Sequence, residues 1–87
     1  MKTKQVDVDG VSYTVREAKM GDMLEHLKLM AEDTQRFQVE LMKASVLGED
    51  GQPLGGRISD LSLQAYIKLS PAVMQVNGFA SDDEGNG

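Results

Sequence analysis

Side chains that could carry out acid–base or metal chemistry are few and scattered in this sequence. Only one histidine is present, His26, and we expect it to be solvated beside Glu25. There is no cysteine, whereas clustered zinc sites are built from several cysteine and histidine ligands. The sequence therefore predicts no metal site and no cofactor.

Carboxylates occur in small clusters, and none is placed in an apolar pocket by its neighbours in the sequence. General acid catalysis needs a carboxyl group whose pKa is raised by such a pocket. We therefore expect solvated charge at all four clusters, which are Asp7/Asp9, Glu32/Asp33, Glu49/Asp50 and Asp82/Asp83/Glu84.

Two further patterns could suggest catalysis, but each lacks the neighbouring residues that the corresponding catalytic motif requires. Residues 50–56 (DGQPLGG) have the glycines of a phosphate loop but lack its Gly-Lys-Ser/Thr ending. The serines at 59, 62 and 70 have no histidine or lysine in a recognisable nucleophile arrangement. We therefore expect a binding protein and not an enzyme.

Composition narrows the class of protein further. The 87 residues carry a formal charge of −5, which disfavours nucleic-acid backbones and anionic membranes as partners. No run of about 18 apolar residues occurs that would suggest a membrane-spanning helix, and the first residues lack the apolar region of a signal peptide. The absence of cysteine fits a reducing cytoplasm. Six methionines against four aromatic residues (two Phe, two Tyr) could either fill a core or form an adaptable binding surface.

The first predicted element is a β-hairpin over residues 4–15, turned by Asp9-Gly10. Asp-Gly favours a two-residue turn because both positions tolerate positive φ. Apolar residues alternate on one face of this hairpin, at Val6, Val8, Val11, Tyr13 and Val15. A lone hairpin is marginally stable in water, so we expect this face to pack on the helices that follow.

Residues 20–47 carry helical periodicity in two parts. In the first part apolar residues recur at the spacing of one helix face, at Met20, Met23, Leu24, Leu27, Met30 and Ala31. A straight continuation would place Thr34 and Gln38 on that face. We therefore expect a kink or break near residues 32–34, with Asp33 or Thr34 as a new N-cap. Whether residues 20–47 form one helix or two stays open.

The second part, residues 34–47, is apolar on two nearly opposite sides and has Gly48 as its expected C′ residue. One stripe contains Phe37, Leu41 and Ala44, and the other contains Val39, Met42 and Val46. Such a helix is either central in a bundle or covered on one side by another chain. As candidate partner-binding residues we choose Val39, Met42, Val46, Tyr66 and Met74, the alternative being that they form the core. On this assignment Met42→Asp should impair partner binding with little effect on folding.

The remaining sequence predicts a loop, two short helices and a tail. Residues 48–57 contain four glycines and Pro53. A helix over residues 58–69 would be capped by Ser59 or Asp60, with an inner face of Leu61, Ala65, Tyr66 and Leu69. Ser70-Pro71 predicts a new helix start, and that helix should stop near Asn77-Gly78.

The predicted fold is thus α+β and mainly helical, an N-terminal β-hairpin followed by about four short helices. We expect one domain over residues 1–80, with the hairpin at 4–15 and helices within 20–47 and 58–79. Residues 81–87 (SDDEGNG) are polar and acidic, and we expect them to form a disordered tail.

Two segments resemble the small tail assembly chaperones of siphophages and of Mu/P2-like myophages. They are VDVDGVSYTVREAKMGDMLEHLKLM at residues 6–30 and ISDLSLQAYIKLSPAVMQVNGF at residues 58–79. The shared pattern is a short β-unit followed by a Gly-Asp at a helix start, and later a short helix that ends near Asn.

The resemblance implies a non-catalytic role in the host cytoplasm during phage assembly. Such chaperones bind the long, partly apolar tape measure protein, keep it soluble, help tail tube subunits assemble, and are absent from the mature virion. The resemblance also allows self-association and a frameshifted extended form. The alternative is a small acidic decoy that binds a host nucleic-acid-binding protein. The affinity of such a decoy for its partner should fall strongly at high ionic strength.

Overall fold

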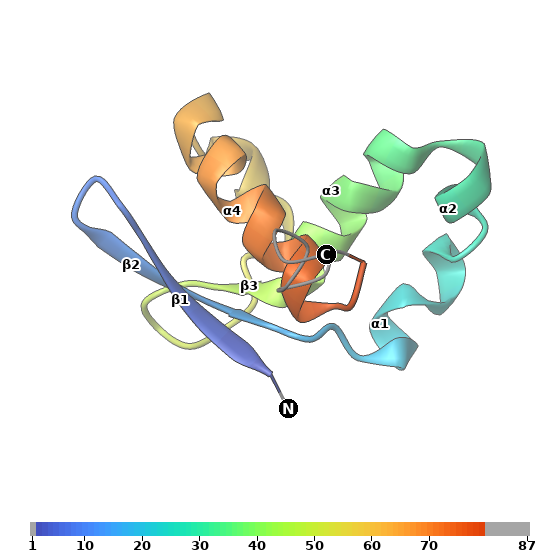
Figure 1. Cartoon of the computed structure of the whole chain (residues 1–87), viewed down its shortest axis with the longest axis horizontal. Coiled ribbons are helices and arrows are strands. Elements are labelled where there is room, and N and C mark those ends of the chain that lie inside the picture. The colour runs from blue at the N-terminus through green and yellow to red at the C-terminus, as the bar shows by residue number, and fades with distance from the viewer. Residues whose placement is uncertain (1, 80–87) are drawn as a thin grey trace, which may run out of the picture.

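The structure of this chain is a computed structural model, which describes residues 2–79. In chain order its elements are β1 (Thr3–Val8), β2 (Val11–Arg16), α1 (Met20–Met23), the 3₁₀ helix η1 (Leu24–His26), α2 (Leu29–Glu32), α3 (Thr34–Ser45), β3 (Val46–Leu47), the 3₁₀ helix η2 (Gly55–Asp60) and α4 (Leu63–Val76). In Figure 1, α4 and α3 lie between the hairpin on the left and the short helices α1 and α2 on the right. The α+β class is confirmed, although the three-stranded sheet makes "mainly helical" too loose a description.

The predicted hairpin is present, and its turn has the predicted chemistry. Asp9 and Gly10 adopt φ values of 51° and 84°, as the two central residues of a type I′ turn do. Val8 pairs with Val11 directly beside that turn. Val8 and Val15 are buried, because α4 packs against both strands of the hairpin. The expectation that the valine face packs on a later helix is confirmed.

A third strand, β3, extends the sheet beside β2 in the order β1-β2-β3. Val46 pairs with Val15 in antiparallel register, and both side chains are fully buried. The prediction that Val46 belongs to a helix ended by Gly48 is therefore wrong, since α3 ends at Ser45. The physical reason is that a β-branched residue beside an open strand gains more from sheet pairing than from one further helical turn.

Residues 20–32 do not form the single helix that their periodicity suggests. They form α1, η1 and α2, which contain four, three and four residues. Within these three elements only Met23 is buried. Helices this short gain little from their own hydrogen bonds, and of the apolar stripe that would hold a longer helix only Met23 is buried.

The break before the second helical part lies where the sequence predicts it. Asp33 is extended, with φ −153° and ψ 84°, and its side chain accepts a hydrogen bond from the Arg36 backbone N–H at 3.2 Å. This is the N-cap arrangement that favours a new helix start. Residues 20–47 are therefore divided at Asp33, and α3 begins at Thr34.

The segment between β3 and α4 folds back along the sheet before η2. Pro53 forms an isolated bridge with Leu47, and the Leu54 N–H donates to the Val46 carbonyl at 2.9 Å. The predicted helix beginning at residue 58 with a cap at 59 or 60 is wrong. The N-cap of α4 is Ser62, whose hydroxyl accepts from the Ala65 N–H at 3.1 Å.

Helix α4 runs through Ser70-Pro71 without restarting, so the predicted break there is wrong. Its buried face continues on both sides of the proline, at Ala65, Leu69, Ala72, Val73 and Val76. Pro71 itself is exposed. The carbonyl that loses its usual partner to this proline belongs to Ile67, a residue that is itself exposed. Packing on the sheet therefore outweighs the local helix-breaking signal.

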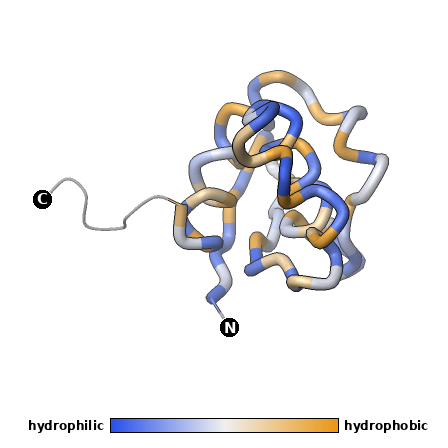
Figure 2. The backbone as a smooth tube through the Cα atoms, turned by 90° about the vertical axis from the view of Figure 1, so that its right-hand side faces the viewer, coloured by the Kyte–Doolittle hydropathy of each residue, from blue (hydrophilic) through white to orange (hydrophobic). Residues whose placement is uncertain are grey.

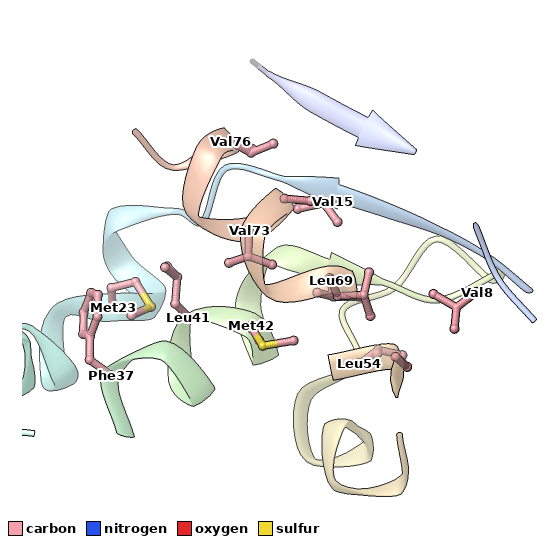
Figure 3. Packing of buried hydrophobic residues seen from close by; sticks show 13 residues of the cluster. Val8, Val15, Met23, Phe37, Leu41, Met42, Leu54, Leu69, Val73 and Val76 are labelled. Carbon is pink, nitrogen blue, oxygen red and sulfur yellow. The ribbon is translucent and has the colours of Figure 1, made fainter. Parts of the chain in front are cut away.

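One buried apolar cluster joins the sheet to α3 and α4. Figure 3 shows Met23, Phe37 and Leu41 at one end of this cluster, and Val8, Leu54 and Leu69 at the other. No helix within residues 2–79 is long and apolar enough to cross a membrane. The predicted acidic tail, residues 81–87, lies outside the described residues.

Candidate partner-binding site

The five residues that the sequence suggested for partner binding do not form one surface. Met42 and Val46 have exposed fractions of 1% and 0%, so neither side chain is available to a partner in this conformation. Val39, Tyr66 and Met74 are half-buried. The expectation of an exposed stripe through Met42 and Val46 is therefore wrong, because β3 pairing and α4 packing cover that side of α3.

Three of these residues nevertheless meet in a pocket between α3, η2 and α4. Val39, Met42 and Tyr66 line it together with Ile58, and its volume is about 330 Å³. The Tyr66 hydroxyl donates to the Gln38 side-chain oxygen at 3.3 Å. Val46 and Met74 are not among the lining residues. Partner binding by Val39, Tyr66 and Met74 remains a prediction.

A more open apolar surface lies at the other side of α3, and we call it the Met-rich groove. Its volume is about 230 Å³, and it is lined by Ala18, Lys19, Met20, Met23, Leu27, Met30, Phe37, Leu41, Asn77 and Phe79. Met20 is 67% exposed and Met30 is 45% exposed. Figure 2 views the molecule from the side of α1 and α2 and shows apolar positions interspersed with hydrophilic ones along the backbone. Large exposed apolar side chains gathered around one groove are typical of an interaction site.

The floor of the Met-rich groove belongs to the hydrophobic core, whereas its exposed apolar residues Met20, Leu27 and Met30 lie in or beside the short helices. Met23, Phe37 and Leu41 belong to the buried cluster. Phe37 contacts the ring of Phe79 edge-on, with ring centres 5.7 Å apart and planes at 76°, a favourable arrangement for two aromatic rings. Phe79 thus closes one end of the groove from beyond α4.

Phe79 is held in place by the way α4 ends. Gly78 has φ 85°, and its N–H donates to the Gln75 carbonyl at 3.1 Å, while the Phe79 N–H donates to the Met74 carbonyl at 2.8 Å. These are the two hydrogen bonds of a Schellman motif. The prediction that the last helix stops at Asn77-Gly78 is confirmed.

Asn77 connects the groove to the rest of the fold. Its side-chain oxygen accepts from the Ala18 N–H at 2.8 Å, and its side-chain nitrogen donates to the Ser45 hydroxyl at 3.0 Å and to the Val73 carbonyl at 2.8 Å. Ser45 is fully buried. One amide therefore joins the segment after β2, the end of α3 and the end of α4, and we call these contacts the Asn77 clasp.

Within the described residues, no histidine and no carboxylate lines the Met-rich groove. The sequence predicted a solvated His26 beside Glu25; in the structure its side chain is 32% exposed, and its Nε2 lies 3.5 Å from the Glu40 carboxylate. The Lys43 ammonium lies 3.3 Å from the same carboxylate. Among residues 2–79 no group of three His, Cys, Asp or Glu side chains could hold a metal ion. The arrangement at the groove is suited to apolar contact.

The sequence signal for the Met-rich groove was the periodic stripe over residues 20–31. That stripe indicated an amphipathic face, and the structure leaves much of the face exposed. The contributions of Asn77 and Phe79 were not predicted, since they depend on the path of the chain after α4.

Comparisons of the chain with protein-family models, with curated proteins and with solved structures found no significant match. The resemblance to tail assembly chaperones therefore stays a prediction from residues 6–30 and 58–79.

Proposed function

We propose that this protein is a phage tail assembly chaperone that binds an apolar helical segment of the tape measure protein. The observation that carries the proposal is the Met-rich groove, in which Met20, Leu27 and Met30 are exposed over a floor of buried aromatic and aliphatic side chains. On this proposal the chaperone keeps the tape measure protein soluble until tail tube subunits assemble on it.

The chemistry of the groove suits a partner whose exact sequence varies along its length. Methionine side chains are flexible and polarizable, so they adapt to differently shaped apolar residues. Helices bind such grooves through apolar anchors spaced three and four residues apart. Full burial of one large apolar side chain contributes about 1.5–3 kcal/mol, and much of that gain is offset by the cost of association. The resulting binding is expected to be reversible, as a chaperone requires.

The test is co-expression of the tagged chain with the tape measure protein, followed by a pull-down at low and at high salt. We expect soluble tape measure protein at both salt concentrations, because apolar contacts are weakly affected by ionic screening. The double variant Met20→Glu/Met30→Glu should no longer recover soluble tape measure protein, since both charges would lie in the groove.

A matched control is available on the outer face of α4. Leu63 and Ile67 are 73% and 60% exposed and do not line the Met-rich groove. Leu63→Glu/Ile67→Glu therefore makes the same change in charge, and also replaces two exposed apolar side chains, at a different surface. This control should retain the tape measure protein. Equal loss in both variants would contradict the groove assignment. Loss of the wild-type complex at high salt alone would indicate electrostatic binding, and no recovery at either salt concentration would leave the acidic decoy as the alternative.

A further inference from the structure

A second candidate binding surface is the outer edge of strand β1, whose backbone groups are not paired with another strand on that side. Strand order β1-β2-β3 makes β1 an outer strand of six residues. The other outer strand, β3, has two residues, and the chain after it covers its edge through the Leu47–Pro53 bridge and the bond from the Leu54 N–H to the Val46 carbonyl. Within residues 2–79, β1 is therefore the long open edge of the sheet.

The hairpin register determines which backbone groups of β1 face outward. In a two-residue hairpin the residues flanking the turn, here Val8 and Val11, exchange both backbone hydrogen bonds, and bonded and non-bonded pairs then alternate along the strands. Thr3, Gln5 and Asp7 lie at the non-bonded positions. Their N–H and C=O groups point away from β2, and they form the hydrogen-bonding pattern that an added strand requires.

A cleft lies directly beside this edge. It has a volume of about 410 Å³ and is lined by Lys2, Thr3 and Lys4 of the β1 end and by Gln75 and Val76 of α4. The Lys4 ammonium donates to the neutral Gln75 side-chain oxygen at 2.8 Å, so this contact leaves its positive charge uncompensated. A strand added to β1 would pass under the last turn of α4, with alternate side chains entering the cleft.

We infer that the β1 edge binds an extended segment of a partner protein that carries acidic residues at its cleft-facing positions. Lys4 shares the helix-facing side of β1 with Val6 and Val8, because side chains alternate along a strand. An antiparallel partner strand would therefore place apolar side chains opposite Val8 and Val6 and a carboxylate opposite Lys4. The expected pattern, read from its N-terminus, is apolar-x-apolar-x-acidic-x-acidic, in which the last acidic residue lies beside Lys2 at the cleft. The inference is independent of the proposed helix-binding groove.

A second copy of this chain is a poorer occupant of the same edge. Two β1 strands related by a two-fold axis pair antiparallel, and with Gln5 opposite Gln5 each Lys4 lies opposite Val6 of the other copy. Such a pair supplies no carboxylate to either Lys4. A partner strand with a carboxylate at this position neutralises Lys4.

The test is titration of the isotope-labelled full chain with the capped heptapeptide Val-Thr-Val-Thr-Glu-Thr-Glu, followed by amide chemical shifts and cross-strand nuclear Overhauser effects. We expect saturable shifts at Thr3, Lys4, Gln5 and Asp7, and binding that weakens as salt rises. The peptide with both glutamates replaced by lysine should bind about tenfold more weakly or worse, because it places like charges beside Lys4.

Two backbone variants make the test specific for strand addition. Thr3→Pro/Asp7→Pro removes two outward N–H groups and leaves the ladder to β2 intact, as proline on an edge strand does when its nitrogen faces solvent. Thr3→Ser/Asp7→Asn retains both N–H groups. The proline variant should lose peptide binding and the control should retain it, with thermal unfolding showing that both are folded.

Several outcomes would overturn the inference. These are absence of saturable shifts, equal binding by the proline variant, or peptide shifts centred on Met20 and Met30. Concentration-dependent dimers that the proline variant abolishes would identify a second copy as the occupant instead. The tape measure pull-down uses groove variants that leave β1 unchanged, so failure of one proposal can be told apart from failure of the other.

Discussion

At the scale of single residues, Met42 shows how an apolar stripe can indicate either a core or a binding surface. The sequence placed it on the side of its helix assigned to a partner, whereas the structure buries it almost completely between α3, η2 and α4. The same periodicity produces both outcomes, and the deciding factor is which other elements reach that side of the helix.

The structure therefore reverses the expected effect of Met42→Asp. A carboxylate at this position would be buried without a partner, at a cost on the order of 4 kcal/mol or more. A chain of this length is stable by about 5–10 kcal/mol. We therefore expect the urea unfolding transition of the variant to lie at a much lower urea concentration, or to lose its cooperativity. Met42→Leu conserves volume and should cost less than about 1.5 kcal/mol. A folded, stable Met42→Asp variant would show that the side chain can reach solvent.

At the scale of elements, the sequence predicted local features well and non-local ones poorly. The Asp9-Gly10 hairpin and the Asp33 cap depend on residues adjacent in the chain, and both were correct. Strand β3 was missed because its two residues are stabilised by pairing with β2, more than thirty positions earlier. The continuous α4 was missed for a similar reason, since the packing that outweighs Pro71 comes from the sheet.

The candidate site was predicted only in part. Residues 20–31 were recognised as a methionine-rich amphipathic face, and they supply four of the ten residues that line the groove. Which side of α3 remains open could not be predicted, because β3 and α4 cover the opposite side by contacts that no local pattern indicates. Phe79 enters the site only through the reversal of the chain at Gly78.

The division of residues 20–32 into three short helices suggests that they are the least stable part of the described fold. Gly21 lies within α1, has no positive φ, and has open space where a Cβ would be added. Gly21→Ala should therefore stabilise the chain by about 0.5–1 kcal/mol through helix propensity alone.

The measurement is the urea midpoint together with hydrogen exchange of residues 20–32. Gly10→Ala is the control, because Gly10 has φ 84° and an alanine there is strained; it should destabilise. If Gly21→Ala slows exchange in α1 and also tightens partner binding, the bound segment is more helical than the free one. A destabilised Gly21→Ala variant would contradict the open surroundings of this residue.

At the scale of the whole molecule, the last turn of α4 borders both proposed surfaces. Gln75 and Val76 line the cleft beside β1, whereas Asn77 and Phe79 line the Met-rich groove. The Asn77 clasp lies between them and joins three segments that are far apart in the sequence. The positions of both surfaces therefore depend on one side-chain amide.

We expect Asn77→Ala to destabilise the whole fold by about 2–4 kcal/mol, since three hydrogen bonds contribute about 1 kcal/mol each and the buried Ser45 hydroxyl loses a partner. Chemical denaturation of Asn77→Ala, Ser45→Ala and the double variant measures the coupling between them. We expect a coupling energy of about 0.5 kcal/mol or more. Additive effects, or an Asn77→Ala loss below about 0.5 kcal/mol, would show that the clasp contributes little.

The same clasp has a consequence for the chemical ageing of the protein. Asn77 precedes Gly78, and an asparagine before glycine deamidates when the glycine nitrogen attacks the side-chain amide. Here the Gly78 N–H is bonded to the Gln75 carbonyl and the Asn77 amide is held on both sides, so attack requires this corner to open. Aspartate at position 77 could not donate to Ser45 or Val73. Deamidation at Asn77 would thus require local opening of this corner, and afterwards the two hydrogen bonds that the Asn77 amide donates could not form again.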